Sequence, residues 1–175
     1  MCLSPALLAI AAPLAPIKQK PKLYFKKINI DEPNSDKIER NIRLFSLKRH
    51  TSLDFKSAST YVSEPNKFFL GYENNKRIDL LRITTPFEKL LPKIIVTFNK
   101  ENFNQYNLRL KSISMILFAL LSIALILNLY YSIKSGKLES DFSMILFLNL
   151  IFYILAYVEF KLVNKKIKKA INWNE

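Results

Sequence analysis

Two long apolar stretches separated by a short polar loop constrain the fold of this chain more than any other feature. Residues 112–133 contain 22 residues without a charge, residues 142–158 contain 17 more, and apolar character continues beyond Glu159. Since an α-helix rises about 1.5 Å per residue, these stretches would reach about 33 Å and 26 Å, against a hydrocarbon core of about 30 Å. We therefore predict a transmembrane hairpin, with its first helix over residues 112–133, an external loop over residues 134–141 and its second helix over residues 142–163.

The chain carries a large excess of positive charge, most of it before the hairpin. Its 175 residues include 27 Lys and Arg against 14 Asp and Glu, a formal charge of +13. Residues 17–111 hold 20 basic and 10 acidic side chains, a net +10, and residues 112–175 hold 7 and 4, a net +3. Such an excess suits an anionic partner, which could be a lipid surface, a nucleic acid or an acidic protein. Because the hairpin already predicts a membrane location, anionic lipid is the simplest of the three.

Residue types that bind metals or carry catalysis are scarce. The chain has one Cys (Cys2), one His (His50) and two Gly. A single Cys excludes an intramolecular disulfide framework and an all-Cys metal site, and two Gly leave no glycine-rich phosphate loop. We therefore expect no metal, no cofactor and no catalytic residue, with His50 at the surface or in a turn. The abundance of Ile, Lys, Asn and Phe is typical of an AT-rich bacterial genome.

The segment of residues 1–17 is uncharged and rich in Ala, Leu and Pro. It lacks the positive n-region of a secretory signal. Pro5 and Pro13 leave only residues 6–12 uninterrupted, which is too short to cross a membrane. We expect a disordered leader, with a signal peptide or an anchor as the alternatives.

Residues 18–111 predict a small basic cytoplasmic α+β domain built on an antiparallel sheet. A capping box at Asp36 and Glu39 indicates the start of a helix over residues 36–48. In residues 67–111, alternating apolar side chains and turn-forming Asn residues predict successive antiparallel strands. The last strand runs directly into the first apolar stretch, so we expect the domain to be held against the membrane without a long linker.

The second apolar stretch is followed by a basic segment, residues 164–175, which we predict to form a short cytoplasmic tail helix. The apolar side chains here fall on one face at helical spacing: Val163, Ile167, Ala170 and Ile171. The segment either continues the membrane helix or lies at the interface with its tryptophan near the headgroups. The residues expected to contact anionic lipid are Lys161, Lys165, Lys166, Lys168, Lys169 and Trp173.

Basic residues beside the apolar stretches predict the orientation of the hairpin. Five lie in residues 86–111 and five in residues 161–175, whereas the loop between the helices carries two. Positive residues favour the cytoplasmic side. We therefore predict a multi-pass protein of the cell membrane, by composition the bacterial inner membrane, with both chain ends in the cytoplasm and the loop outside.

Three polar side chains within the apolar stretches are candidate contact residues. Asn128 and Asn149 lie at similar depths below the outer end of the hairpin, about 8 and 10 Å, which predicts an interhelical hydrogen bond worth on the order of 1 kcal/mol. A substrate or permeation site would need more polar lining. Glu159 lies near the inner end, where we predict an interfacial ion pair with Arg109 or Lys111 in preference to a proton-relay role.

These features favour a non-enzymatic protein whose hairpin anchors a basic domain that binds anionic lipid, a protein partner or a second copy of the chain. The alternatives are a membrane enzyme acting on a lipid or phosphate substrate, and a subunit of an oligomeric channel or transporter. The spacing of the arginines demonstrates no phosphate site, and the apolar stretches lack the Gly/Pro-broken pattern of transport sites. Nucleic acid is not an expected partner, because no stacking motif or known module is recognisable.

Overall fold

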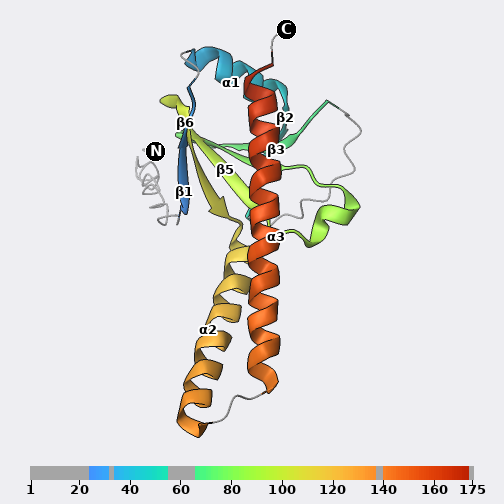
Figure 1. Ribbon diagram of the computed structural model, residues 1–175. Helices are drawn as coiled ribbons and strands as arrows, with labels where there is room; N and C mark the ends of the chain where they lie inside the picture. The colour runs from blue at the N-terminus through green and yellow to red at the C-terminus, as the bar shows by residue number, and fades with distance from the viewer. Residues whose placement is uncertain (1–23, 32–33, 55–65, 137–139, 174–175) are drawn as a thin grey trace, which may run out of the picture.

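A computed structural model describes residues 24–31, 34–54, 66–136 and 140–173; the leader predicted over residues 1–17 lies outside these ranges. The molecule is elongated, with a β-sheet at one end and two long helices extending from it, the second of which also runs along the sheet (Figure 1). The elements in chain order are β1 (Lys26–Asn29), α1 (Ser35–Leu44), β2 (Ser46–Arg49), β3 (Phe69–Glu73), β4 (Arg77–Arg82), the 3₁₀ helix η1 (Pro86–Leu90), β5 (Ile94–Asn99), β6 (Asn102–Leu110), α2 (Ser112–Ser135) and α3 (Ser140–Ile171).

The strands form one mixed sheet in the order β1-β6-β5-β4-β3-β2. Neighbouring strands are antiparallel except β2 and β3, which pair in parallel. The α+β class predicted from the sequence is confirmed, but the prediction of an antiparallel sheet is wrong at this edge. Parallel neighbours need a long crossover connection, and β2 and β3 are separated by residues 50–68 in the sequence.

Helix α1 is shorter than the sequence indicated. Its N-cap is Asn34, whose side chain accepts hydrogen bonds from the backbone N–H groups of Asp36 and Lys37, both at 3.1 Å. Residues 46–49 form β2 and pair with β3, although residues 46–48 were predicted to be helical. One face of the helix and the residue that follows it are apolar and buried: Ile38, Ile42 and Phe45.

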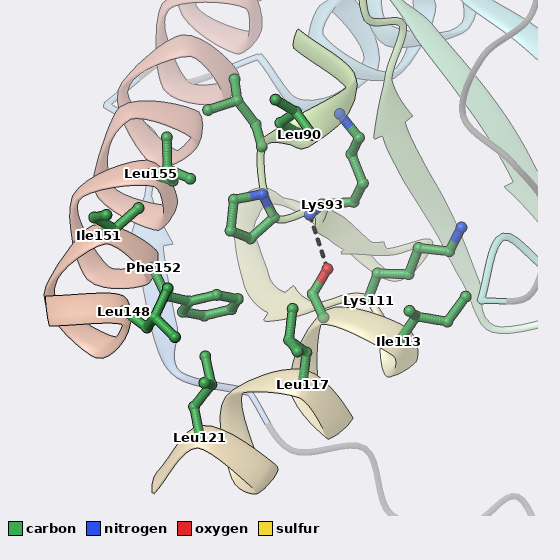
Figure 2. Close-up of a pocket in the computed structure, with 13 residues that line it drawn as sticks. Leu90, Lys93, Lys111, Ile113, Leu117, Leu121, Leu148, Ile151, Phe152 and Leu155 are labelled. Carbon is green, nitrogen blue, oxygen red and sulfur yellow. Dashed lines mark hydrogen bonds between the residues drawn. The ribbon is translucent and has the colours of Figure 1, made fainter. Parts of the chain in front are cut away.

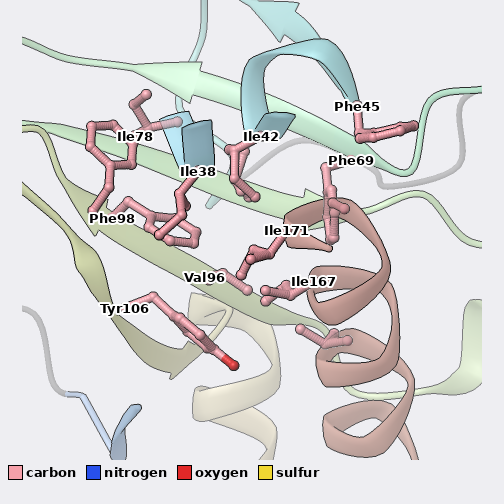
Figure 3. Close-up of a cluster of buried hydrophobic side chains, with 14 of the residues drawn as sticks. Ile38, Ile42, Phe45, Phe69, Ile78, Val96, Phe98, Tyr106, Ile167 and Ile171 are labelled. Atoms are coloured by element: carbon pink, nitrogen blue, oxygen red, sulfur yellow. The ribbon is translucent and has the colours of Figure 1, made fainter. Parts of the chain in front are cut away.

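The main hydrophobic core lies on one face of the sheet, beneath α1 and the last part of α3 (Figure 3). Strand side chains that alternate toward this face include Ile78, Val96 and Phe98. The apolar face predicted for the C-terminal segment completes this core with Val163, Ile167, Ala170 and Ile171. A smaller core on the opposite face is formed by Leu53, Leu70, Leu81 and Ile95, so the central strands are buried on both sides.

Helices α2 and α3 form a hairpin that begins at the sheet. One residue separates the end of β6 at Leu110 from the start of α2, as the sequence predicted. Helix α2 ends at Gly136, whose φ of 66° lies in the left-handed region that glycine adopts without strain. Phe118 of α2 stacks on Phe152 of α3, with ring centroids 5.6 Å apart. By length and composition both helices could cross a membrane.

Helix α3 is continuous over 32 residues, so the prediction of a separate short C-terminal helix is wrong. Its basic part contains no Gly or Pro that would end the helix. At about 1.5 Å per residue the helix is about 48 Å long, which lets its first part pack on α2 and its last part on the sheet. Asn41 of α1 closes the far end, donating from Nδ2 to the carbonyls of Ile171 at 3.1 Å and Trp173 at 3.0 Å. The first bond satisfies a carbonyl that the end of α3 leaves free, and the second holds the chain just beyond the helix.

Candidate functional site

A buried ion pair joins the sheet to α3 where the hairpin begins. Arg82 ends β4 and is 3% exposed, and Glu159 of α3 is fully buried. The guanidinium donates from Nη2 to Oε2 of Glu159 at 2.5 Å and from Nε to Oε1 at 3.3 Å. Its Nη1 donates to Oε2 of Glu88 in η1 at 2.9 Å. One arginine therefore ties β4 and the adjacent η1 to α3, which lies far away in the sequence.

The partner of Glu159 differs from the pair predicted from the sequence, which was Arg109 or Lys111. Side chains alternate between the two faces of a strand. Arg82 shares the face of Leu80, on which α3 packs, whereas Arg109 points to the opposite face and binds carboxylates there. Lys111 lies two residues further on; burial lowers its pKa, and the charge of Asp54 on that same face opposes the shift.

The ionised forms of this cluster stabilise one another. Burial lowers the pKa of Arg82, but the hydrogen bonds and negative charges of Glu159 and Glu88 outweigh it and raise the pKa above its ordinary value. Burial likewise raises the pKa of Glu88, but the backbone N–H of Thr85 and the Arg82 guanidinium outweigh it and lower the pKa. Opposite charges this close favour the charged state of each group. The charged forms of Arg82 and Glu88 are therefore favoured in the folded protein.

A second buried cluster lies on the opposite face of the sheet. Arg109 donates to both carboxylate oxygens of Asp54, at 2.6 and 3.1 Å, and to Asp79 at 3.4 Å. Thr97 donates to Asp79 at 2.7 Å, and the hydroxyl of Ser112 donates to Asp54 at 3.0 Å. Because Ser112 is the first residue of α2, this cluster fixes the start of the hairpin to the sheet.

An apolar groove of about 510 Å³ lies between α2 and α3 where they leave the sheet (Figure 2). Leu117 and Leu121 of α2 face Ile151 and Leu155 of α3 across it, and Leu90 lies at the end nearest the sheet. Pockets that hold small molecules typically measure about 300–1,000 Å³ and are mostly apolar. The groove has the size and lining of a ligand site.

Lys93 stands at the sheet end of the groove (Figure 2). Its backbone N–H donates to the hydroxyl of Ser114 in the first turn of α2 at 3.0 Å, and its Nζ donates to the carbonyl of Glu88 at 2.6 Å. Burial lowers the pKa of Lys93; the charge of Glu159 opposes this shift and that of Arg82 adds to it. Among the residues that the structure describes, this ammonium group makes no ion pair.

The lysines of α3 that were predicted to bind lipid extend along the helix, some beside aromatic rings. Nζ of Lys161 lies 4.9 Å from the centroid of the Tyr157 ring, and those of Lys166 and Lys169 lie 4.6 and 5.3 Å from that of Phe68. These distances are within the cation–π range of about 6 Å. The other two lysines of the set are exposed: Lys165 and Lys168.

Trp173 lies at the far end of α3 from the hairpin. Its ring packs edge-on against Phe45 of α1, with centroids 5.4 Å apart, and it is 43% exposed. Fourteen residues separate it from Glu159, a rise of about 20 Å along a helix. This position sets Trp173 apart from the groove and from the lysines nearest the hairpin.

The structure does not bring the side chains of Asn128 and Asn149 together in a hydrogen bond. Asn149 donates across the hairpin to the carbonyl of Leu121 at 3.2 Å, and within its own helix to Ile145 at 3.0 Å. Asn128 donates to Ala124 in its own helix at 3.0 Å. Leu121 lies 14 residues before the end of α2, whereas Asn149 lies nine after the start of α3. Helices staggered in this way set the two asparagines at different levels.

No group of three or more His, Cys, Asp or Glu side chains in the described part of the chain could hold a metal ion, and His50 is exposed. Comparison of the chain with protein-family models, curated proteins and solved structures finds no match.

Sequence reasoning missed the Arg82 cluster and the groove. A signal for the cluster was present, because Arg82 ends a strand whose other residues read as buried on both faces. A buried cation needs a carboxylate partner. The groove left no such signal, since its residues come from three segments and resemble ordinary apolar positions in each.

Proposed function

We propose that this protein is a two-span integral membrane protein that holds a basic α+β domain at the membrane surface, where it binds anionic lipid. Helix α3 is the observation that carries the proposal. Its first part is apolar and packs on α2, and its last part lies in the core of the sheet. The domain therefore cannot move away from the hairpin without losing its own core.

The outer surface of the hairpin supports membrane insertion. None of the most apolar 18-residue window of α2 is buried within the molecule, and only 17% of that of α3. A core helix of a soluble protein would be mostly buried. Large apolar side chains are instead exposed along both helices, among them Ile116, Leu120, Phe147 and Leu150. Contiguous exposed apolar surface of this kind suits lipid.

Exposed apolar side chains at the hairpin end of the sheet support a position of this end at the bilayer surface. Phe25 is 52% exposed, and its N–H bonds to the carbonyl of Leu108 near the end of β6. Leu90 of η1 is 86% exposed beside the first turn of α2. Aromatic and apolar side chains at this level fit the interfacial region of a bilayer. Counting of basic residues assigns the sheet and both chain ends to the cytoplasmic side.

The topology can be tested by cysteine accessibility in intact cells. With Cys2→Ser as background, Ser135→Cys at the end of α2 should react with a membrane-impermeant maleimide. Asn75→Cys, in the β3–β4 turn at the opposite end, should react only after permeabilisation. The reverse pattern would overturn the orientation, and extraction of the protein by alkaline carbonate would overturn membrane insertion.

The lysines of α3 should contribute to lipid binding in order of their distance from the hairpin. Lys161 and Lys168 are separated by about 10 Å along the helix, and charges are screened beyond about 8 Å at physiological ionic strength. In nanodiscs of mixed phosphatidylglycerol and phosphatidylcholine, changing Lys161 and Lys165 to Gln should reduce enrichment of the anionic lipid around the full-length protein. The matched change of Lys168 and Lys169 should reduce it less. Equal effects, or enrichment insensitive to salt, would contradict a surface electrostatic mechanism.

A further inference from the structure

The groove between α2 and α3 changes in character along its length. Its sheet end is lined by Lys93, Lys111 and Ser114. Its other end is lined by apolar side chains such as Leu121 and Leu148 (Figure 2). Ser114 and Leu121 are seven residues apart, which is about 10 Å along α2. With α2 crossing the bilayer from its first residue, the polar end lies at headgroup level and the remainder lies in hydrocarbon.

The polar end retains capacity to bind an anion. A lysine ammonium has three donors, and that of Lys93 uses one on the Glu88 carbonyl within the described residues. The Ser114 hydroxyl accepts from the Lys93 backbone, which leaves its own proton free to donate. Helix α2 begins here with no side-chain cap and no acidic residue in its first turn. The positive end of its dipole therefore adds to the attraction for a negative group.

We infer that this groove binds one glycerophospholipid molecule, with the phosphate at Lys93 and Ser114 and one acyl chain between α2 and α3. The inference deepens the proposed function and rests on it, because the groove faces lipid only when the hairpin is inserted. The lining changes from a lysine and a serine hydroxyl at the sheet end to apolar side chains further along. A lipid with one anionic headgroup and an apolar chain matches both parts. A second copy of the chain would present an apolar helix, which offers no anionic group to the remaining donors of Lys93 and Ser114.

The phosphate contact can be tested by changing Lys93 to Gln in the full-length protein. Lipid binding is measured in detergent by mass spectrometry of intact complexes, with phosphatidylglycerol and a diacylglycerol of the same acyl chains as probes. Because a charge-assisted hydrogen bond is lost, phosphatidylglycerol should bind about tenfold more weakly. Diacylglycerol, which has no phosphate, should bind as it does to the unchanged protein. Lys76→Gln, on the exposed β3–β4 turn, removes the same charge away from the groove and should have no effect.

The acyl-chain contact can be tested by filling the groove. Leu117→Trp places a large side chain on the groove wall, whereas Leu120→Trp makes the same change at a position 60% exposed on the same helix and outside the lining. The first variant should weaken binding of both probes and the second should change neither. This pair gives an answer even where Lys93→Gln impairs folding.

The inference is overturned by phosphatidylglycerol binding that is unchanged in Lys93→Gln, or by equal effects of the two tryptophan variants. Such a result leaves the proposed function standing when the protein still inserts and enriches anionic lipid in nanodiscs. Failure of membrane insertion overturns both proposals. Competition by inorganic phosphate without any effect of Leu117→Trp would indicate a soluble anion as the ligand and would overturn the lipid assignment.

Discussion

Arg82 shows how one residue can determine the geometry of a junction. It is buried between carboxylates of η1 and α3, and its bidentate contact with Glu159 fixes α3 relative to β4. Removal of one partner from a buried ion pair leaves an uncompensated charge, whereas replacement of both by apolar groups is often close to neutral.

Glu159→Gln should therefore lower the free energy of unfolding by about 3–5 kcal/mol. The double variant with Arg82→Met and Glu159→Met should recover most of this loss. Thermal unfolding in detergent measures both. Arg43→Met, which breaks a pair with a 43% exposed arginine side chain, is the control and should cost about 1 kcal/mol or less. A double variant less stable than Glu159→Gln would contradict this account.

Glu73 gives the fold a pH dependence in the acid range. Hydrogen bonds from Arg43 and Lys100 lower the pKa of Glu73 from 4.5 to about 2. Because the folded pKa is depressed, the carboxylate stabilises the fold above about pH 5, and this contribution is lost as pH falls toward 2. The melting temperature of the unchanged protein should therefore fall more steeply in this range than that of Glu73→Gln, by about 2–4 °C for an ion pair worth 1 kcal/mol. Parallel curves would exclude Glu73 as the titrating group.

The sequence was informative about which residues need partners and less so about which partners they have. Glu159 was recognised as an unusual carboxylate in an apolar stretch, and the structure does place it in an ion pair. The choice of Arg82 over Arg109 depends on which face of the sheet α3 covers. That relation is set by packing between segments far apart in the chain, which local spacing does not encode.

Among the elements, the hairpin offers a direct comparison of two asparagines. Asn149 is 5% exposed and bonds to the opposite helix, whereas Asn128 bonds only within its own helix. Asn149→Ala should destabilise the hairpin by about 1 kcal/mol, and Asn128→Ala should have a smaller effect. Thermal unfolding of the two variants in the same detergent gives the difference. A larger loss for Asn128→Ala would favour direct pairing of the two asparagines.

Whether a segment forms a helix or a strand was easier to predict than which other elements it packs against or pairs with. Alternation and turn residues anticipated the strands β3 to β6, and apolar length anticipated α2 and the first part of α3. The short strand β2 was assigned to α1, because residues 46–49 follow the helix without a breaking residue and gain strand geometry only by pairing with β3. Continuation of the membrane helix was weighed against an interfacial helix, but packing of this segment on the sheet was not predicted, since a helix has the same periodicity in either setting.

For the molecule as a whole, the hydrophobic core on one face of the sheet is incomplete without α3. Residues 24–111 lack the side chains of Val163, Ile167, Ala170 and Ile171, which are buried against the strands. We therefore expect this segment alone to give a poorly dispersed amide NMR spectrum. The same segment joined through a flexible linker to residues 156–173 should give a dispersed one. A folded segment without α3 would show that the strands and α1 suffice.

The sharing of α3 between hairpin and sheet also has a consequence for biosynthesis. Strands β1 to β6 leave the ribosome before either apolar helix, yet residues 163–171, which close their core, emerge only after both. One apolar face of the sheet therefore stays partly uncovered until both helices of the hairpin have been synthesised. Transiently exposed surface of this kind attracts chaperones and proteases. The core of the sheet can therefore close only after α3 has been synthesised. A chain whose synthesis stops before α3 leaves this apolar face exposed and should be a substrate for proteases.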